Sequence, residues 1–415
     1  MQRRQIIVVG GGLAGTATAL GLARAGFDTL LAAPEPPADK RSSAILGKSL
    51  AFIADLGVVE ALGEAKAPLA VMRIVDDLGR LFRAPTVEFK ASETGLSAFG
   101  INALNADIGA ALKAVAEKTD NLEIRPVAAT GLTLDDDRAV VTLADGTEIA
   151  ADLVVAADGR RSAMREAAGI TAQNWSYPQT AIVLNFEHSR DHGSVSTEFH
   201  TRTGPFTQVP LPGRHSSLVW VEDPKLAALY IDLKPDKLST TIAEKLHWIL
   251  GDVSADGPIA RYPLGGSRVD RLTAKRLALV GEAAHAFPPI GAQGLNLGLR
   301  DAEALVNLAS QSLDDPGSRL MLSRYEAARR GDVISRTAGV DVLNRSLLMD
   351  FLPGQIARSG TMAAMGLVAP LRQFAMREGL VPGAGLTGLP HSVRKWMGGH
   401  EAGRDGVEEQ GYGRH

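Results

Sequence analysis

An apolar run near the start of the chain ends in closely spaced glycines. Residues 6–9 precede Gly10-x-Gly12-x-x-Gly15, and an alanine-rich stretch with helical spacing follows. Glycine permits the tight bend, the close approach of the backbone to a pyrophosphate, and the packing of the helix on the sheet. The pattern predicts a strand–turn–helix unit that binds a dinucleotide, with Leu13 and Ala14 inside the turn. A glycine-rich turn without a ligand is the alternative.

The second apolar run lacks the acidic residue that usually binds the ribose about 20 residues after the glycines. Ala33 stands there, followed by Pro34 and Glu35. Two possibilities follow from the sequence. Either Glu35 reaches back to the ribose, or the backbone and Arg41 hold its 2′-hydroxyl.

Composition excludes several classes of protein. The chain has 415 residues, of which 45% are hydrophobic and 22% charged, enough for two globular domains. Its net charge of −3 gives no basic surface for nucleic acid. It has no cysteine, so disulfides and thiolate-held metal sites are excluded, and we predict no metal site. We expect a cytoplasmic protein, because no segment resembles a secretory signal or a membrane span.

Glycines also follow the apolar runs that end near Asp158 and Gly281. Between these two junctions the sequence changes to short β-rich runs broken by proline and glycine. We therefore predict an α/β fold: a Rossmann-like domain with an inserted antiparallel β-sheet substrate domain and C-terminal helices. The predicted limits are 1–70, 92–171 and 264–340 for the discontinuous cofactor domain, 71–91 and 172–263 for the β-rich domain, 341–383 for a helical segment, and 384–415 for a flexible tail.

The two later junctions carry longer motifs. "DLVVAADGRRSAMRE" (152–166) and "RLALVGEAAHAFPPIGAQGLNLGLRDAEAL" (276–305) resemble the paired signatures of single-component FAD-dependent aromatic monooxygenases, the group A flavoprotein hydroxylases. Within that class the chain is most similar to the ubiquinone-biosynthesis hydroxylase family, to about residue 380. The resemblance implies FAD as cofactor and NAD(P)H or another reductant as electron donor. It also implies hydroxylation of an aromatic ring by O₂ through a flavin C4a-hydroperoxide, with a polyprenylated phenol as the expected substrate.

The resemblance also implies which residues contact FAD. The first turn would hold the ADP part, Asn105 the phosphate or ribityl region, and Asp158 and Gly159 both FAD and the nicotinamide. Glu282 replaces the Asp that the family usually places after Gly281; it keeps the charge and adds one methylene. The expected cofactor-binding residues are Gly10, Gly12, Leu13, Ala14, Gly15, Glu35, Arg41, Asn105, Asp158, Gly159, Gly281, Glu282, Pro289, Gly291, Gln293, Gly294, Leu295 and Asn296.

The loop at 288–296 has a role that can be stated on physical grounds. A Pro-Pro entry followed by glycines lets the backbone approach a flat ring. The helix that starts near Gly294 would direct its free N–H groups toward the ring, where they stabilise the negative charge of a reduced flavin.

We predict no catalytic side chain, because the cofactor carries the chemistry. His285 is expected to be a packing residue more readily than a base. His188, His192, His200 and His215 lie in the β-rich insert, where one could face substrate, although a surface position is expected for each.

Residues 351–381 are rich in methionine and alanine, with Arg358, Arg372 and Arg377 interspersed. They could form an amphipathic helix at a membrane surface, or a helix that closes the cofactor domain or a subunit interface. A biosynthetic complex or an oligomer is compatible with either arrangement. Two other functions stay open: a flavin-dependent reductase or dehydrogenase of an isoprenoid lipid, and a non-catalytic FAD-binding scaffold.

Overall fold

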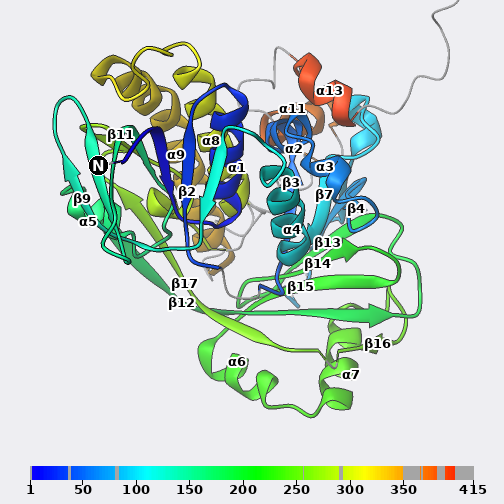
Figure 1. Cartoon of the computed structure of the whole chain (residues 1–415). Helices are drawn as coiled ribbons and strands as arrows, with labels where there is room; N and C mark the ends of the chain where they lie inside the picture. Colours follow the sequence, from blue (N-terminus) through cyan, green and yellow to red (C-terminus); the bar gives the residue numbers. More distant parts are fainter. Residues whose placement is uncertain are drawn as a thin grey trace, which may run out of the picture.

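A computed structural model gives the fold shown in Figure 1. Two large sheets and one small sheet form its framework, and helices flank them. None of the helices in the described part of the chain is long and apolar enough to cross a membrane. The structure describes residues 2–35, 39–79, 84–255, 257–288, 293–348, 365, 368–380 and 388–397.

The first sheet has a parallel centre. Ile6, Ile7 and Val8 on its central strand are fully buried, as expected for a strand covered by helices on both faces. The strands run in the order β18-β19-β11-β1-β2-β8, and β10 joins β11 to β9. Their bounds are β1 Gln2–Val9, β2 Thr29–Ala32, β8 Leu122–Arg125, β9 Ala129–Leu134, β10 Ala139–Leu143, β11 Glu148–Ala156, β18 Thr273–Ala274 and β19 Leu277–Leu279.

Helices α1 (Leu13–Arg24), α8 (Gln293–Ala309) and α9 (Arg319–Leu348) pack with this sheet. Parallel strands joined through α1, with the glycine turn at the carboxyl end of β1, are the arrangement of a Rossmann-like domain. The predicted fold class is confirmed for this part of the chain.

The second sheet is largely antiparallel, as the β-rich insert predicted. Its order is β20-β17-β12-β15-β14-β13-β5-β6, with β16 beside β12. One pairing is parallel, because β5 joins β13 from a distant part of the chain. The predicted domain limit between residues 263 and 264 falls inside β17. The predicted domain limits as a whole stay a prediction. The bounds are β5 Val71–Asp76, β6 Val87–Lys90, β12 Ala172–His188, β13 Val195–His200, β14 Pro205–Leu211, β15 His215–Glu222, β16 Val253–Ser254, β17 Ala260–Val269 and β20 His285–Ala286.

Side-chain alternation gives this sheet two different faces. Phe199, Phe206 and Trp220 form an apolar core with α6 (Pro224–Ile231) and α7 (Pro235–Lys245). Figure 1 shows both helices on the side of the sheet that is remote from the first sheet. The opposite face is turned toward the Rossmann-like part.

A small sheet that the sequence did not predict lies next to β14 of the second sheet. It consists of β3 (Ser42–Leu46), β7 (Gly100–Leu104) and β4 (Ala67–Pro68). The Asn102 side-chain amide donates to the carbonyl of Pro210 at 2.7 Å and so ties it to the second sheet. Its neighbouring helices are α2 Gly47–Asp55, α3 Val58–Ala61 and α4 Asn105–Ala116, and the short helices η1 Ala91–Thr94, α5 Ala163–Ala167 and η2 Gly281–Ala283 complete the framework.

Residues 388–397, the described part of the expected flexible tail, include a helix. Helix α13 (His391–Met397) packs on α2; Val393 is fully buried and the Trp396 indole N–H donates to Asp55 at 2.9 Å. Part of the 384–415 segment is therefore helical, because an apolar side chain finds a core position there. Helix α11 (Ala369–Leu380) precedes it and buries Met376 and Leu380.

Candidate functional site

The turn after β1 requires glycine at two positions. Gly10 has a φ of +112°, and a Cβ there would lie 2.3 Å from the carbonyl oxygen of Ala157. A Cβ on Gly15 would lie 2.0 Å from the carbonyl oxygen of Gly10, so the helix can approach the turn only through glycine. A Cβ on Gly12 would meet nothing within 4 Å. Open space therefore lies at the N-terminus of α1, where an anion is favoured.

The side chains of Leu13 and Ala14 contact protein. Leu13 packs against the apolar core beneath α2 and α4. The Cβ of Ala14 would lie 3.3 Å and 3.2 Å from Cβ atoms placed on Gly281 and Gly298. These two residues can therefore serve a ligand through their backbone N–H groups.

Packing explains why Ala33 stands where an acidic residue usually binds the ribose. Its side chain is buried, and a Cβ on Gly11 would lie 2.8 Å from the Cβ of Ala33, so a small residue fits beneath the turn. Glu35 is exposed two residues later. Both routes to the ribose, through Glu35 and through Arg41, stay predictions.

Arg41 belongs to a cluster that the sequence only partly indicated. Its guanidinium donates to the carboxylate of Asp39 with distances of 2.6 and 2.8 Å, and the side-chain amide of Asn105 donates to the same carboxylate at 2.8 Å. Burial raises the pKa of Asp39, but the hydrogen bonds from Arg41 and Asn105 outweigh it and lower that pKa overall. The ionised carboxylate thus fixes the start of α4 beside the Arg41 loop. The charged run at residues 39–41 was the only sequence signal for Asp39.

In the second motif, residues 152–166, side-chain hydrogen bonds stabilise the turn after β11. The two oxygens of Asp158 accept from the Ser162 hydroxyl at 2.5 Å and from the backbone N–H of Met164 at 3.1 Å. Gly159 has a φ of +83°, which suits glycine. Arg165 is buried and donates to the carbonyl of Ala283 at 3.1 Å. It therefore links this turn to the third motif.

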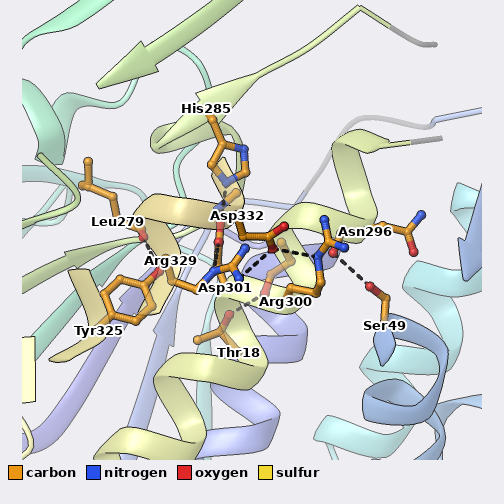
Figure 2. Close-up of polar contacts among 12 residues, drawn as sticks. Thr18, Ser49, Leu279, His285, Asn296, Arg300, Asp301, Tyr325, Arg329 and Asp332 are labelled. Carbon is orange, nitrogen blue, oxygen red and sulfur yellow. Dashed lines mark hydrogen bonds and ion pairs between the residues drawn. The ribbon is translucent and has the colours of Figure 1, made fainter. Parts of the chain in front are cut away.

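The third motif, residues 276–305, contains a network of buried hydrogen bonds and ion pairs (Figure 2). Asp301 accepts from the backbone N–H of Gly281 at 3.1 Å, contacts the His285 ring at 2.6 Å and accepts from Arg329 at 2.8 Å. Arg329 and Arg300 both pair with Asp332. His285, only 1% exposed, thus occupies a packing position, as expected. Sequence reasoning missed the rest of this network, for which acidic and basic residues at helical spacing in α8 and α9 were the only signal.

The start of α8 shows what the expected residues there contact. Gly294 is exposed and Leu295 is half-buried. The Asn296 side chain joins α8 to β3, donating to the carbonyl of Ala44 at 2.7 Å and accepting from the N–H of Leu46 at 2.9 Å. Its amide is therefore occupied by protein. Gln293 begins the helix; its side chain, Pro289 and Gly291 lie outside the described residues.

The histidines of the insert differ from the expected surface positions. His188 and His200 are each 5% exposed, because both lie within the sheet and bond to neighbouring polar groups. His192 is half-buried, and His215 alone of the four is exposed.

Comparisons with known proteins agree with this geometry. Residues 3–337 match a family model described as an FAD binding domain. The ubiquinone hydroxylase UbiL of Rhodospirillum rubrum is 34% identical over 389 residues, which cover 90% of this chain and 89% of that protein. The chain belongs to the FAD-dependent aromatic hydroxylases. The 3-demethoxyubiquinol 3-hydroxylase of Escherichia coli is 30% identical over 91% of this chain and 99% of its own.

The fold of the hydroxylase is also similar to a solved structure. The p-nitrophenol 4-monooxygenase PnpA from Pseudomonas putida superposes with a TM-score of 0.74 at 21% identity, covering 94% of this chain and 100% of that chain. The hydroxylase is an FAD-dependent monooxygenase. FAD supplies the oxygen chemistry in such an enzyme.

Glu282 gives a direct test of the altered third motif. Its side chain is 54% exposed and lies 3.5 Å from Arg160. If it bonds the ribityl hydroxyls, Glu282→Ala should weaken FAD binding about tenfold, the effect of losing a hydrogen bond to a charged group. Glu282→Asp should retain FAD and turnover. The measurement is flavin absorbance per protein after dialysis; equal retention by the Ala variant would mean that Glu282 only pairs with Arg160.

Proposed function

We propose that the hydroxylase adds one oxygen atom to the ring of a polyprenylated phenol in ubiquinone biosynthesis. The observation that carries this proposal is its 34% identity, across nine-tenths of the chain, to a protein named ubiquinone hydroxylase. An apolar cluster on the second sheet is consistent with such a substrate. Ala181, Val183, Val221 and Leu264 cluster on the second sheet, away from α6 and α7.

We also propose where FAD lies. The pyrophosphate would occupy the open space beside Gly12, at the N-terminus of α1. The ribityl chain would pass between Arg41 and Glu282. The hydrogen bond to Asp39 raises the pKa of Arg41 most, and the negative charge of Glu282 adds to this effect, so the two side chains are near each other. The flavin ring would then lie near the start of α8, with backbone N–H groups directed at its pyrimidine edge.

The decisive experiment uses purified protein with FAD. A short-chain prenylated phenol, O₂ and NADH or NADPH should give a product heavier by one oxygen atom, with O₂ uptake that depends on the phenol. A flavin-dependent reductase would oxidise the nicotinamide and change the substrate without O₂. A scaffold would bind FAD that no nicotinamide or protein donor reduces. Release of FMN rather than FAD would contradict the cofactor assignment.

A peripheral membrane contact is a second proposal, for delivery of the lipid substrate. Val368, Leu371 and Phe374 at α11 are 46%, 41% and 40% exposed. The charged part of the original expectation is weaker, because Arg372 pairs with Glu93 at 2.8 Å and Arg358 lies outside the described residues. Apolar insertion would therefore dominate the contact.

Replacing both Leu371 and Phe374 by serine should reduce sedimentation of the hydroxylase with phosphatidylcholine–phosphatidylglycerol vesicles severalfold, with FAD content unchanged. Leu229→Ser on α6 is the matched control, since Leu229 is 65% exposed on another part of the molecule. Wild-type protein that stays in the supernatant at low salt would contradict a membrane contact.

A further inference from the structure

Three polar side chains, called the polar group below, lie on the face of the second sheet opposite α6 and α7: Glu198, His200 and Thr207. Phe199 and Phe206 point toward those helices. Their neighbours Glu198, His200 and Thr207 therefore point to the other face. Register places Glu198 beside Thr207, which is followed across the sheet by Val219 and Val183.

This face meets the loop that enters the cofactor site. The side-chain amide of Asn185, two residues from Val183 on the same strand, donates to the carbonyl of Lys40 at 2.9 Å. The Arg41 guanidinium lies 5.3 Å from the centre of the Tyr262 ring, and Tyr262 pairs with Ala181. The polar group and the valines thus share one face with residues that contact the Arg41 loop.

The hydrogen bonds of the Glu198 carboxylate determine which ring nitrogen of His200 carries the hydrogen. Its Nε2 lies 2.9 Å from Oε1 of Glu198, whose other oxygen accepts from the Thr207 hydroxyl at 3.2 Å. An ionised carboxylate can only accept, so Nε2 carries the hydrogen in the neutral ring. Nδ1 is then a hydrogen-bond acceptor, and it is buried without a partner in the structure described.

Two further polar atoms on this face have no partner among the described residues. The hydroxyl oxygen of Ser217 and Oδ1 of Asn185 are also buried and unsatisfied, and the two residues pair across β15 and β12. Buried polar atoms in native proteins nearly always have a partner, so each exception needs an explanation. A ligand that brings hydroxyl or ether oxygens to an otherwise apolar face would provide one.

We propose that His200 is a catalytic base that takes the proton of the substrate's phenolic hydroxyl, and that Glu198 is a positioning residue that holds the ring and stabilises its positive charge. This inference rests on the proposed function. The O–H bond of the phenol breaks, an N–H bond forms at Nδ1, and the electron pair remains on the phenolate oxygen; no oxidation occurs in this step. A phenolate donates electron density to its ring, so the ring carbon reacts more readily with an electrophilic oxygen.

Among the described residues, two other charged side chains lie near His200 in the sheet and its following turn. Asp76 lies beside it on β5, but its carboxylate accepts from the backbone N–H groups of Leu78 and Ala84. Arg202, two residues further on, donates to the carbonyl of Leu78. In the described part of the chain, Glu198 is therefore the charged group that bonds the imidazole.

The test compares FAD-loaded wild type, His200→Gln, Glu198→Gln and the control His215→Gln, whose ring is exposed. With a short-chain prenylated phenol, single-turnover hydroxylation at pH 7 should fall about 100-fold or more in His200→Gln, the usual contribution of a general base. The loss should shrink as pH approaches the pKa of the phenol itself, about 10. Glu198→Gln should show a smaller loss in the same direction. Equal rates and pH profiles in His200→Gln and His215→Gln would overturn the inference.

A binding measurement separates this inference from the proposed function. Difference spectra of 4-nitrophenol with the FAD-loaded protein should show bound nitrophenolate below the probe's solution pKa in the wild type and in His215→Gln. His200→Gln should bind the neutral phenol. Wild type that makes no hydroxylated product but binds nitrophenolate through His200 would refute the function and retain the base. Absence of bound nitrophenolate in the wild type would refute the base, whatever the wild-type turnover.

Discussion

Gly12→Val is expected to yield a folded protein that does not retain FAD. A side chain at this position enters open space, so the fold tolerates it, but that space is where the pyrophosphate would lie. Overpacking costs about 1–3 kcal/mol, which corresponds to roughly 5- to 150-fold weaker binding. Flavin absorbance per protein measures the loss, and circular dichroism measures the fold.

A matched control separates the ligand from the backbone. Gly331 on α9 is also exposed, with nothing within 4 Å of an added Cβ, so Gly331→Val should keep FAD. Gly15→Ala should behave differently again, because its methyl group would lie 2.0 Å from a backbone carbonyl and should damage the fold itself. A Gly12→Val protein with full FAD content would contradict the proposed position of the pyrophosphate.

Asp301→Ala is expected to be strongly destabilising. The substitution leaves the buried Arg329 without one of its carboxylates and removes the partner of His285 and of the Gly281 N–H. Breaking a buried ion pair by removing one member typically costs about 3–5 kcal/mol. Urea unfolding of the FAD-loaded protein measures the difference. Asp136→Ala, whose carboxylate is 82% exposed beside Lys275, should leave stability nearly unchanged, because solvent screens an exposed ion pair.

The stabilisation from Asp301 should also depend on pH. Burial raises the pKa of Asp301, but the charges of His285 and Arg329 and their hydrogen bonds lower it overall. A depressed pKa contributes stability above the unfolded value of about 3.9 and loses it as pH falls through the folded value. The difference between wild type and Asp301→Ala should therefore persist at neutral pH and shrink only in acid. Similar unfolding curves for the Asp301 and Asp136 variants would contradict a structural role for the network.

Sequence patterns predicted the elements that depend on residues close together in the chain. The glycine spacing at Gly10 and Gly15 predicted the first turn, because backbone contacts below 2.5 Å exclude any side chain there. The short alternating runs predicted the antiparallel sheet, because its two faces have different surroundings. The longer motifs at Asp158 and Gly281 indicated the family.

Partners distant in the chain could not be predicted in this way. Asp39 acquires its role from Asn105, Asn296 from Ala44 and Leu46, and Glu198 from Thr207 on the next strand. The parallel pairing of β5 with β13, the docking of α13 on α2 and the burial of His200 likewise depend on which segments meet.

The Rossmann-like turn and the inserted sheet could be predicted from the sequence, because glycine sterics and side-chain periodicity act between neighbouring residues. The family followed from the resemblance of the longer motifs. The tertiary structure alone decided which polar side chains are occupied and which are available. Asn296 and Asp158 are taken up by the protein, whereas Nδ1 of His200 is buried without a partner in the described residues. The physical reason is that a buried polar atom's energy depends on the partner it meets, and folding brings those partners from far along the chain.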